Sequence, residues 1–273
     1  MTFTEGQVTT IALCWRIERR DGVAIGLTGH DRDLVVDGLV HRAAPGMVPS
    51  AIERSDGLEA DTMDVAGALT SSAIGERDLL AGRWDGARVR VFAVDWSADT
   101  IGAEGRVDLG EGVIGAVETK DGSFSAELRG ESAALDRPVG EETSPECRAE
   151  LGDRRCRVAM AGRRRMVRVA GTAGRVVTVD ADAPFPDAYG GGLLRWIGGA
   201  NSGLESAIVA SAGASVTLRA EPALEVKAGD LVELIEGCDK SLATCAGRFG
   251  NVANFRGEPY LPGIDLLTRY PGA

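Results

Sequence analysis

Residues 88–96 read Arg-Val-Arg-Val-Phe-Ala-Val-Asp-Trp, and this stretch indicates the fold class of the chain. Val89 and Val91 alternate with arginines, and apolar side chains recur as far as Trp96. Alternation with a period of two puts the apolar side chains on one face of an extended strand. The stretch is therefore typical of a half-buried strand, and it predicts a β-rich protein.

Short apolar stretches separated by turn residues lie on both sides of this strand. Asp21-Gly22 separates residues 8–19 from 23–27, and Asp37-Gly38 separates 34–36 from 39–42. Asp-Gly between two apolar runs is a strong hairpin signal, so we expect two hairpins here. Further strands are expected at 106–109, 113–118 and 123–129.

Helices are expected at only two places in this half of the chain. Residues 70–80 would form one, with Ser71 or Ser72 as its N-cap and Gly82 at its end, and residues 131–135 would form a second. Residues 137–157 then interrupt the strand pattern with prolines, charges and two cysteines. We therefore place a domain boundary near residue 140.

Six more short strands follow this boundary. They are expected at 164–170, 174–180, 192–196, 206–210, 215–220 and 230–236. Their even spacing favours a small β-barrel or sandwich, whereas residues 237–273 are expected to be mostly loop. The predicted protein is mainly β, with an N-terminal β-rich domain (1–140) and a second domain (141–273). A β-rich insert at about 158–236 would separate two cysteine-bearing loops of the second domain.

The composition limits the possible functions. The chain has 273 residues and a formal net charge of −11. Because lysine and arginine neutralise phosphates, this balance argues against a nucleic-acid binder. We expect no transmembrane helix and no secretory signal, which indicates a chain made in a reducing cytoplasm, where stable disulfides are rare.

Four of the five cysteines form two pairs. Cys147 and Cys156 enclose eight residues, Cys238 and Cys245 enclose six, and 81 residues lie between the pairs. Structural zinc usually uses tighter Cys-x2–4-Cys spacings, whereas loops around an iron–sulfur cluster tolerate wider ones. From spacing alone, an iron–sulfur cluster, zinc, and ordinary thiols or disulfides all remain open.

The other candidate residues are interpreted as structural. Cys14 lies in an apolar strand and is expected to be a buried core thiol. His30 is expected to hydrogen-bond its neighbours in a charged turn, and His41 to lie at a surface or strand edge. Gly190-Gly191-Gly192 is interpreted as a flexible loop. With two histidines and no Gly-x-Ser-x-Gly or Walker motif, the sequence predicts no enzyme.

Residues 237–263 read GCDKSLATCAGRFGNVANFRGEPYLPG, and this stretch resembles the C-terminal motif of the tail-hub and tail-tip family of long-tailed bacteriophages and gene transfer agents. Residues 27–34, 82–96 and 147–156 resemble further family segments in the same order, with Gly29 at a position that is usually Asp. The resemblance spans most of residues 11–263.

The resemblance implies a structural hub protein at the distal end of a tail. It implies a homotrimeric ring between a distal tail protein ring above and a central tip or fibre protein below, with membrane contact only during delivery, if at all. DNA would pass through the channel without specific binding, and an acidic lumen would repel its phosphates.

The resemblance also implies a ligand set. Cys147, Cys156, Cys238 and Cys245 would bind a [4Fe–4S] cluster, with zinc as the alternative metal. The protein would be located at the tail tip of a virion or gene transfer agent particle, and in the bacterial cytoplasm during assembly. A zinc-stabilised binding module, or less favourably a tail-associated enzyme, is the alternative function.

Overall fold

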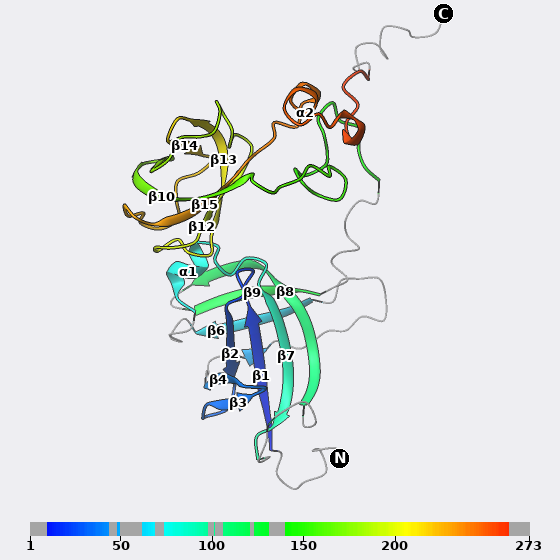
Figure 1. Ribbon diagram of the computed structural model, residues 1–273. Helices are drawn as coiled ribbons and strands as arrows, with labels where there is room; N and C mark the ends of the chain where they lie inside the picture. Colours follow the sequence, from blue (N-terminus) through cyan, green and yellow to red (C-terminus); the bar gives the residue numbers. More distant parts are fainter. Residues whose placement is uncertain are drawn as a thin grey trace, which may run out of the picture. The chain divides into compact units, whose positions relative to one another are not determined.

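The computed structural model describes residues 10–43, 48–49, 62–68, 74–97, 101, 106–120, 123–130 and 140–261 (Figure 1). The chain divides into two compact units, Met1–Val139 and Gly140–Ala273. The described part is mainly β with very little helix, which confirms the predicted fold class. No described helix is long and apolar enough to cross a membrane.

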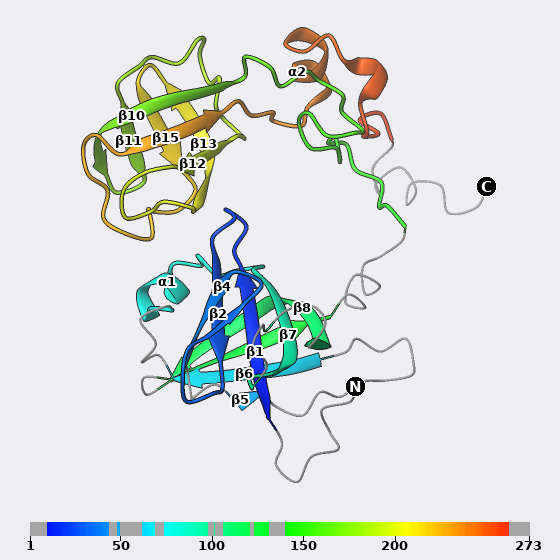
Figure 2. The same ribbon diagram turned by 60° about the horizontal axis from the view of Figure 1, so that its bottom comes forward.

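The first unit is built on one strongly curled, nine-stranded sheet (Figure 2). The strand order is β3-β4-β2-β1-β7-β8-β9-β6-β5, and only the β2–β4 pair is parallel. The strands are β1 (Ile11–Glu18), β2 (Ala24–Thr28), β3 (Leu34–Val36), β4 (Leu39–Ala43), β5 (Val48–Pro49), β6 (Thr62–Ala68), β7 (Arg88–Asp95), β8 (Arg106–Lys120) and β9 (Ser123–Arg129).

The two predicted hairpins are confirmed. β1 pairs with β2 across the turn at Gly22, whose φ is +87°, and β3 pairs with β4 across Asp37 and Gly38, both with positive φ. Two consecutive residues with positive φ are what a two-residue type I′ turn requires. The Asp-Gly dipeptides therefore fix the start of the sheet.

Two expected elements differ in the structure. Residues 106–109 and 113–118 belong to one 15-residue strand, β8, which pairs with β7 along its first part and with β9 along its second. Register shifts in both pairings let β8 bend without ending. The helix α1 covers only Glu76–Leu80 with Gly75 as its N-cap, and the expected caps Ser71 and Ser72, like residues 131–135, lie outside the described residues.

His41 is buried, which corrects the expected surface or edge position. Its side chain is about 1% exposed because β4 lies between β3 and β2 and is therefore not an edge strand. The ring contacts Phe92 edge-on and lies over Gly26, where a Cβ atom would come within 2.7 Å of the ring. Cys14 is fully buried in the same core, as expected.

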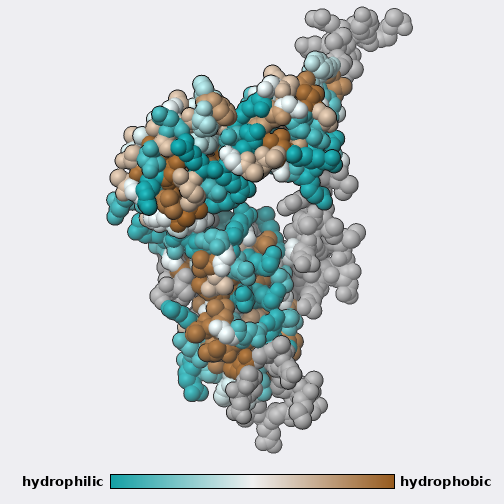
Figure 3. Space-filling model, in the orientation of Figure 1, coloured by the Kyte–Doolittle hydropathy of each residue, from teal (hydrophilic) through white to brown (hydrophobic). Residues whose placement is uncertain are grey.

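The β3–β4 hairpin, which forms one edge of this sheet, carries apolar side chains at the surface. Val35 of β3 and Val40 of β4 face each other in the hairpin register and are 58% and 48% exposed. Figure 3 shows apolar surface in this part of the first unit. Exposed neighbouring apolar residues on an edge hairpin are typical of a surface that another chain covers.

The second unit contains a closed six-stranded barrel in the order β10-β11-β14-β13-β12-β15. Its strands are β10 (Arg164–Ala173), β11 (Val176–Val179), β12 (Leu193–Trp196), β13 (Glu205–Ala212), β14 (Ser215–Leu218) and β15 (Leu231–Ile235). All six strands were expected, and closure shows that the barrel alternative is correct. Val177, Leu194 and Trp196 are among the fully buried side chains of its core.

Candidate metal centre

The two cysteine-bearing segments flank the barrel in sequence and lie together in the structure. We call residues 140–163 and 236–261 the cysteine lobe. Cys147 and Cys156 lie in turns before β10, Cys238 follows β15, and Cys245 lies on the helix α2 (Leu242–Gly247). The structure thus brings together four residues that the sequence separates by as many as 98 positions.

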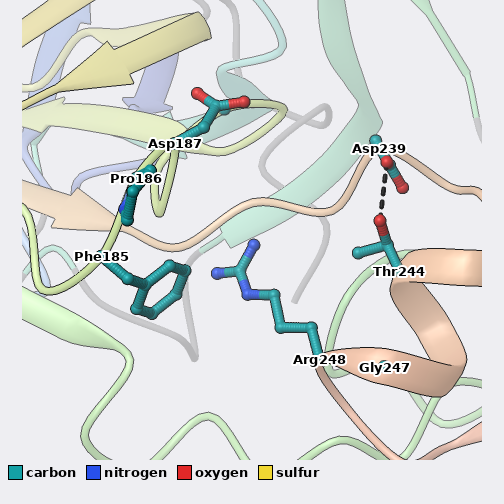
Figure 4. Close-up of a pocket in the computed structure, with 8 residues that line it drawn as sticks. Phe185, Pro186, Asp187, Asp239, Thr244, Gly247 and Arg248 are labelled. Carbon is teal, nitrogen blue, oxygen red and sulfur yellow. Dashed lines mark hydrogen bonds between the residues drawn. The ribbon is translucent and has the colours of Figure 1, made fainter.

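The helix α2 is a difference from the expected loop. Ser241 is its N-cap and accepts a hydrogen bond from the Thr244 backbone N–H at 3.1 Å. Thr244 Oγ1 in turn donates to Asp239 at 2.7 Å, which the dashed line in Figure 4 marks. A Ser before a short run of good helix formers is a recognisable signal for the start of a helix. Because Cys245 lies on α2, this helix sets the direction of the Cys245 side chain.

Backbone hydrogen bonds join the two segments of the lobe directly. The Cys147 N–H donates to Lys240 O and the Arg148 N–H donates to Arg256 O, both at 2.9 Å. Lys240 Nζ reaches back to Ala149 O at 2.7 Å. The two ends of the barrel insert are therefore held side by side next to the cysteines.

A bidentate ion pair closes the far side of the lobe. Arg148 donates to both carboxylate oxygens of Glu258, at 2.6 and 2.7 Å. This hydrogen bonding lowers the pKa of Glu258 from its usual 4.5 to about 2 and raises the pKa of Arg148. Paired N–H···O bonds of this kind fix orientation as well as distance.

Three of the four sulfurs accept hydrogen bonds from the lobe. The Lys240 N–H donates to Cys238 Sγ at 3.4 Å, and the Arg256 N–H donates to Cys147 Sγ at 3.3 Å. The Asn251 side-chain amide lies 3.7 Å from Cys156 Sγ. Hydrogen-bond donors around ligand sulfurs are typical of the surroundings of a metal-bound thiolate.

The end of the barrel fixes Cys238. Gly237 lies against residues 190–192 so closely that a Cβ atom on it would fall within 3.0 Å of Gly190 O and Gly192 N. A Cβ atom on Gly191 would lie 2.7 Å from Cys238 O. The glycine run is therefore a packed backbone crossing that positions Cys238, which corrects its interpretation as a flexible loop.

An arginine pair joins the two segments of the lobe at the same place, and one of the two arginines also reaches the barrel unit. Glu236, 8% exposed, accepts from Arg163 at 2.6 Å and from Arg248 at 2.8 Å. Arg248, which directly follows α2, also donates to Ala188 O and Gly237 O and stacks on Phe185. It borders an open pocket of about 420 Å³ between the barrel and α2 (Figure 4). Glu236 was not singled out for this role from the sequence, because only the folded chain brings it to the two arginines.

The four thiols influence one another electrostatically. Burial raises the pKa of the Cys245 thiol, and the thiols of the other three cysteines raise it further. Burial also raises the pKa of the Cys238 thiol, and the Cys147 thiol raises this pKa further. No two of the described cysteines form a disulfide.

The sulfurs are not gathered as tightly as around one ion. Among the described residues, no group of three or more His, Cys, Asp or Glu side chains is arranged to hold a single metal ion. Tetrahedral zinc holds its sulfurs at bonds of about 2.3 Å. A cluster of several irons is a larger object, and its four thiolate ligands can come from loops that are further apart.

Comparison with known proteins identifies the family. A family model described as "Baseplate hub protein, N-terminal attachment domain" matches residues 2–159, more than half of the chain. The chain belongs to the phage baseplate hub protein family. The resemblance recognised in the sequence is thereby confirmed.

Two further matches extend over the rest of this baseplate hub protein. A model described as "Phage conserved hypothetical protein BR0599" matches residues 187–265, which contain Cys238 and Cys245. A solved chain titled "Virion of native gene transfer agent (GTA) particle" has a TM-score of 0.84 and 36% identity, covering 99% of this chain and 94% of that one. No curated protein matches the sequence.

Proposed function

We propose that this baseplate hub protein is a structural, non-enzymatic component of the tail tip of a gene transfer agent or phage particle. The observation that carries the proposal is the 36% identity over 99% of the chain with a chain of a native gene transfer agent virion. A match that includes both units supports a common role for the whole chain and not for one domain alone.

In this proposal three copies form a ring that joins the distal tail ring to the central tip protein. A family model described as an attachment domain matches residues 2–159, which include nearly all of the first unit, and this unit exposes Val35 and Val40 on an edge hairpin. Those residues are the contacts we expect another tail protein to cover. Membrane contact would be confined to delivery.

The charge distribution supports a passage for DNA along the first unit. Residues 1–139 contain 14 basic and 24 acidic residues, whereas residues 140–273 contain 16 and 17. Nearly all of the net charge of −11 therefore belongs to the first unit. An acidic wall repels phosphates, so we expect this unit to line the channel.

The proposal includes a [4Fe–4S] cluster held by Cys147, Cys156, Cys238 and Cys245. Of the lobe's described residues, only Ala149 and Cys245 are buried apolar side chains, so the lobe has almost no hydrophobic core of its own. A domain without a core needs a covalent or metal cross-link to be stable. When bound, the cluster would supply four metal–thiolate bonds that hold the two segments together.

The cluster is tested by purifying the protein without oxygen and measuring iron, acid-labile sulfide and zinc together with the visible spectrum. We expect about four irons and four sulfides per chain and a brown protein. A colourless protein with one zinc or no metal would refute the cluster. Cys238→Ser should lose iron, whereas Cys14→Ser, which alters the core thiol, should keep it.

The hub assignment is tested separately by assembly. We expect the purified chain to form trimers in light scattering, and particles made without it to have tails that lack the tip. Val35→Glu with Val40→Glu should prevent incorporation into tails, because the change puts two charges into the proposed contact. Both residues are exposed, so the chain should still fold. Normal tails built with this double variant would exclude the hairpin as the contact.

A further inference from the structure

One residue, Asn251, connects the two cysteine pairs to each other through its backbone and its side chain. The Asn251 backbone N–H donates to Cys245 O at 3.0 Å. Its side-chain Nδ2 donates to Cys156 O at 2.6 Å and lies 3.7 Å from Cys156 Sγ. Asn251 thus contacts a cysteine of the first pair and a cysteine of the second, which are 89 positions apart in sequence.

A second asparagine orients this amide. Asn254 Nδ2 donates to Asn251 Oδ1 at 2.7 Å, and the Asn254 backbone N–H donates to Asn251 O at 2.9 Å. Because Oδ1 is occupied as an acceptor, the NH2 group of Asn251 must face Cys156. The 3-10 turn η3 (Val252–Asn254) sets the spacing between the two asparagines.

Asn251 differs from the other donors near sulfur. Cys147 and Cys238 accept from backbone N–H groups, which any residue at those positions supplies. At Cys156 the donor is a side chain, so its presence depends on residue type. A substitution can therefore remove this one donor and leave the other two in place.

We propose that Asn251 is a positioning residue that sets the reduction potential of the metal centre at the four cysteines. This inference rests on the proposed [4Fe–4S] cluster. Hydrogen bonds to ligand sulfurs offset negative charge, so they favour the reduced form of a cluster. Losing the Asn251 donor should therefore make the centre harder to reduce.

Asn251→Asp is the sharpest test because it keeps the shape and replaces the donor with a carboxylate oxygen. In the anaerobically purified full chain, we expect the midpoint potential in a redox titration followed by electron paramagnetic resonance to fall. The expected shift is at least tenfold in the reduction equilibrium, or about 59 mV for one electron. Asn254→Ala, which frees the amide without removing it, should cause a smaller fall.

A stability control separates tuning from loosening of the fold. Val177→Ala weakens the barrel core, where Val177 is fully buried and distant in sequence from the cysteines. It should lower the unfolding temperature and leave the potential unchanged. If Asn251→Asp does not retain iron, Asn254→Ala decides the question with its potential.

Two results would overturn the proposal in distinguishable ways. Wild-type protein without iron and sulfide would refute the cluster and this inference with it. The second result is a wild-type protein and an Asn254→Ala variant that both carry the full cluster and have equal midpoint potentials. If the potential of Asn251→Asp is also unchanged where that variant carries the cluster, only the role of Asn251 is refuted.

Discussion

Gly237→Ala should uncouple the cysteine lobe from the barrel. The added Cβ atom would fall within 3.0 Å of Gly190 O and Gly192 N, a distance that real Cβ atoms essentially never show. Both neighbours are backbone atoms, so no side chain can rotate away. Either the 190–192 crossing opens or the chain carrying Cys238 moves.

The size of the effect follows from this geometry. Overpacking in a well-packed site costs about 1–3 kcal/mol, and a clash with backbone on the facing segment belongs at the upper end. With a urea dependence of roughly 1.5–2 kcal/mol per molar, a loss of about 3 kcal/mol lowers the unfolding midpoint by about 1.5–2 M.

Fluorotryptophan labelling allows the two units to be followed separately in the full chain. Trp196 is buried in the barrel, and Trp15 is buried in the first unit. In urea titrations followed by fluorine resonance, Gly237→Ala should shift the Trp196 transition and leave the Trp15 transition in place. Iron content should fall as well, because Cys238 directly follows the altered residue.

Gly247→Ala is the matched control for this substitution. It makes the same chemical change in the same segment, but nothing lies within 4 Å of the added Cβ atom, and Gly247 ends the helix α2. Alanine is favoured over glycine in helices by up to about 1 kcal/mol, so this variant should be neutral or slightly stabilised. Equal midpoints for the two variants would refute the packing argument.

Three further predictions concern protonation and metal removal. Burial lowers the pKa of His41 below its usual 6.5. The unfolded chain therefore binds a proton at His41 more readily than the folded chain does, and the first unit should lose stability as pH falls below about 6.5. His41→Asn, which keeps a donor for Leu39 O, should flatten this dependence in thermal unfolding at pH 5 and 7.5. The Glu258 carboxyl should titrate near pH 2 by carbon NMR, and Arg148→Gln should return the pKa of this carboxyl toward 4.5. The stability that the Arg148–Glu258 pair provides is present above about pH 4.5 and is lost as pH falls toward 2. Removing metal with a chelator should speed amide exchange in the cysteine lobe and leave the barrel protected, whereas equal exchange with and without metal would show that the lobe needs no cross-link.

The regular part of this fold could be predicted because its signals are local. Asp21-Gly22 and Asp37-Gly38 specify turns by their own backbone preferences, and the barrel strands are marked by alternation and turn residues. The position of His41 could not be predicted in this way. It depends on the parallel pairing of β4 with β2, which no residue within β4 encodes.

For the proposed metal centre, the sequence pointed to the four cysteines but not to the glycine contact that holds Cys238. Spacing and loop context drew attention to the four cysteines, and the family resemblance suggested what they bind. Gly237 gave no local signal, because it packs against a segment about 46 positions away. Glycine is common in this sequence, so residue type alone does not mark this position.

The contrast between barrel and lobe suggests why the ligands are divided between both ends of an 81-residue insert. The barrel closes on itself and buries its own apolar side chains, so it holds its first and last strands together: β10 pairs with β15. The segments that leave these two strands therefore emerge as neighbours. The entropy cost of closing a loop rises only slowly with its length. Because the folded barrel has already brought the two ends of the insert together, gathering the four cysteines costs the lobe little further entropy. The barrel would in this sense be the scaffold of the proposed metal centre, and variants that open it near β10 and β15 should loosen the cysteine lobe even where every cysteine is retained.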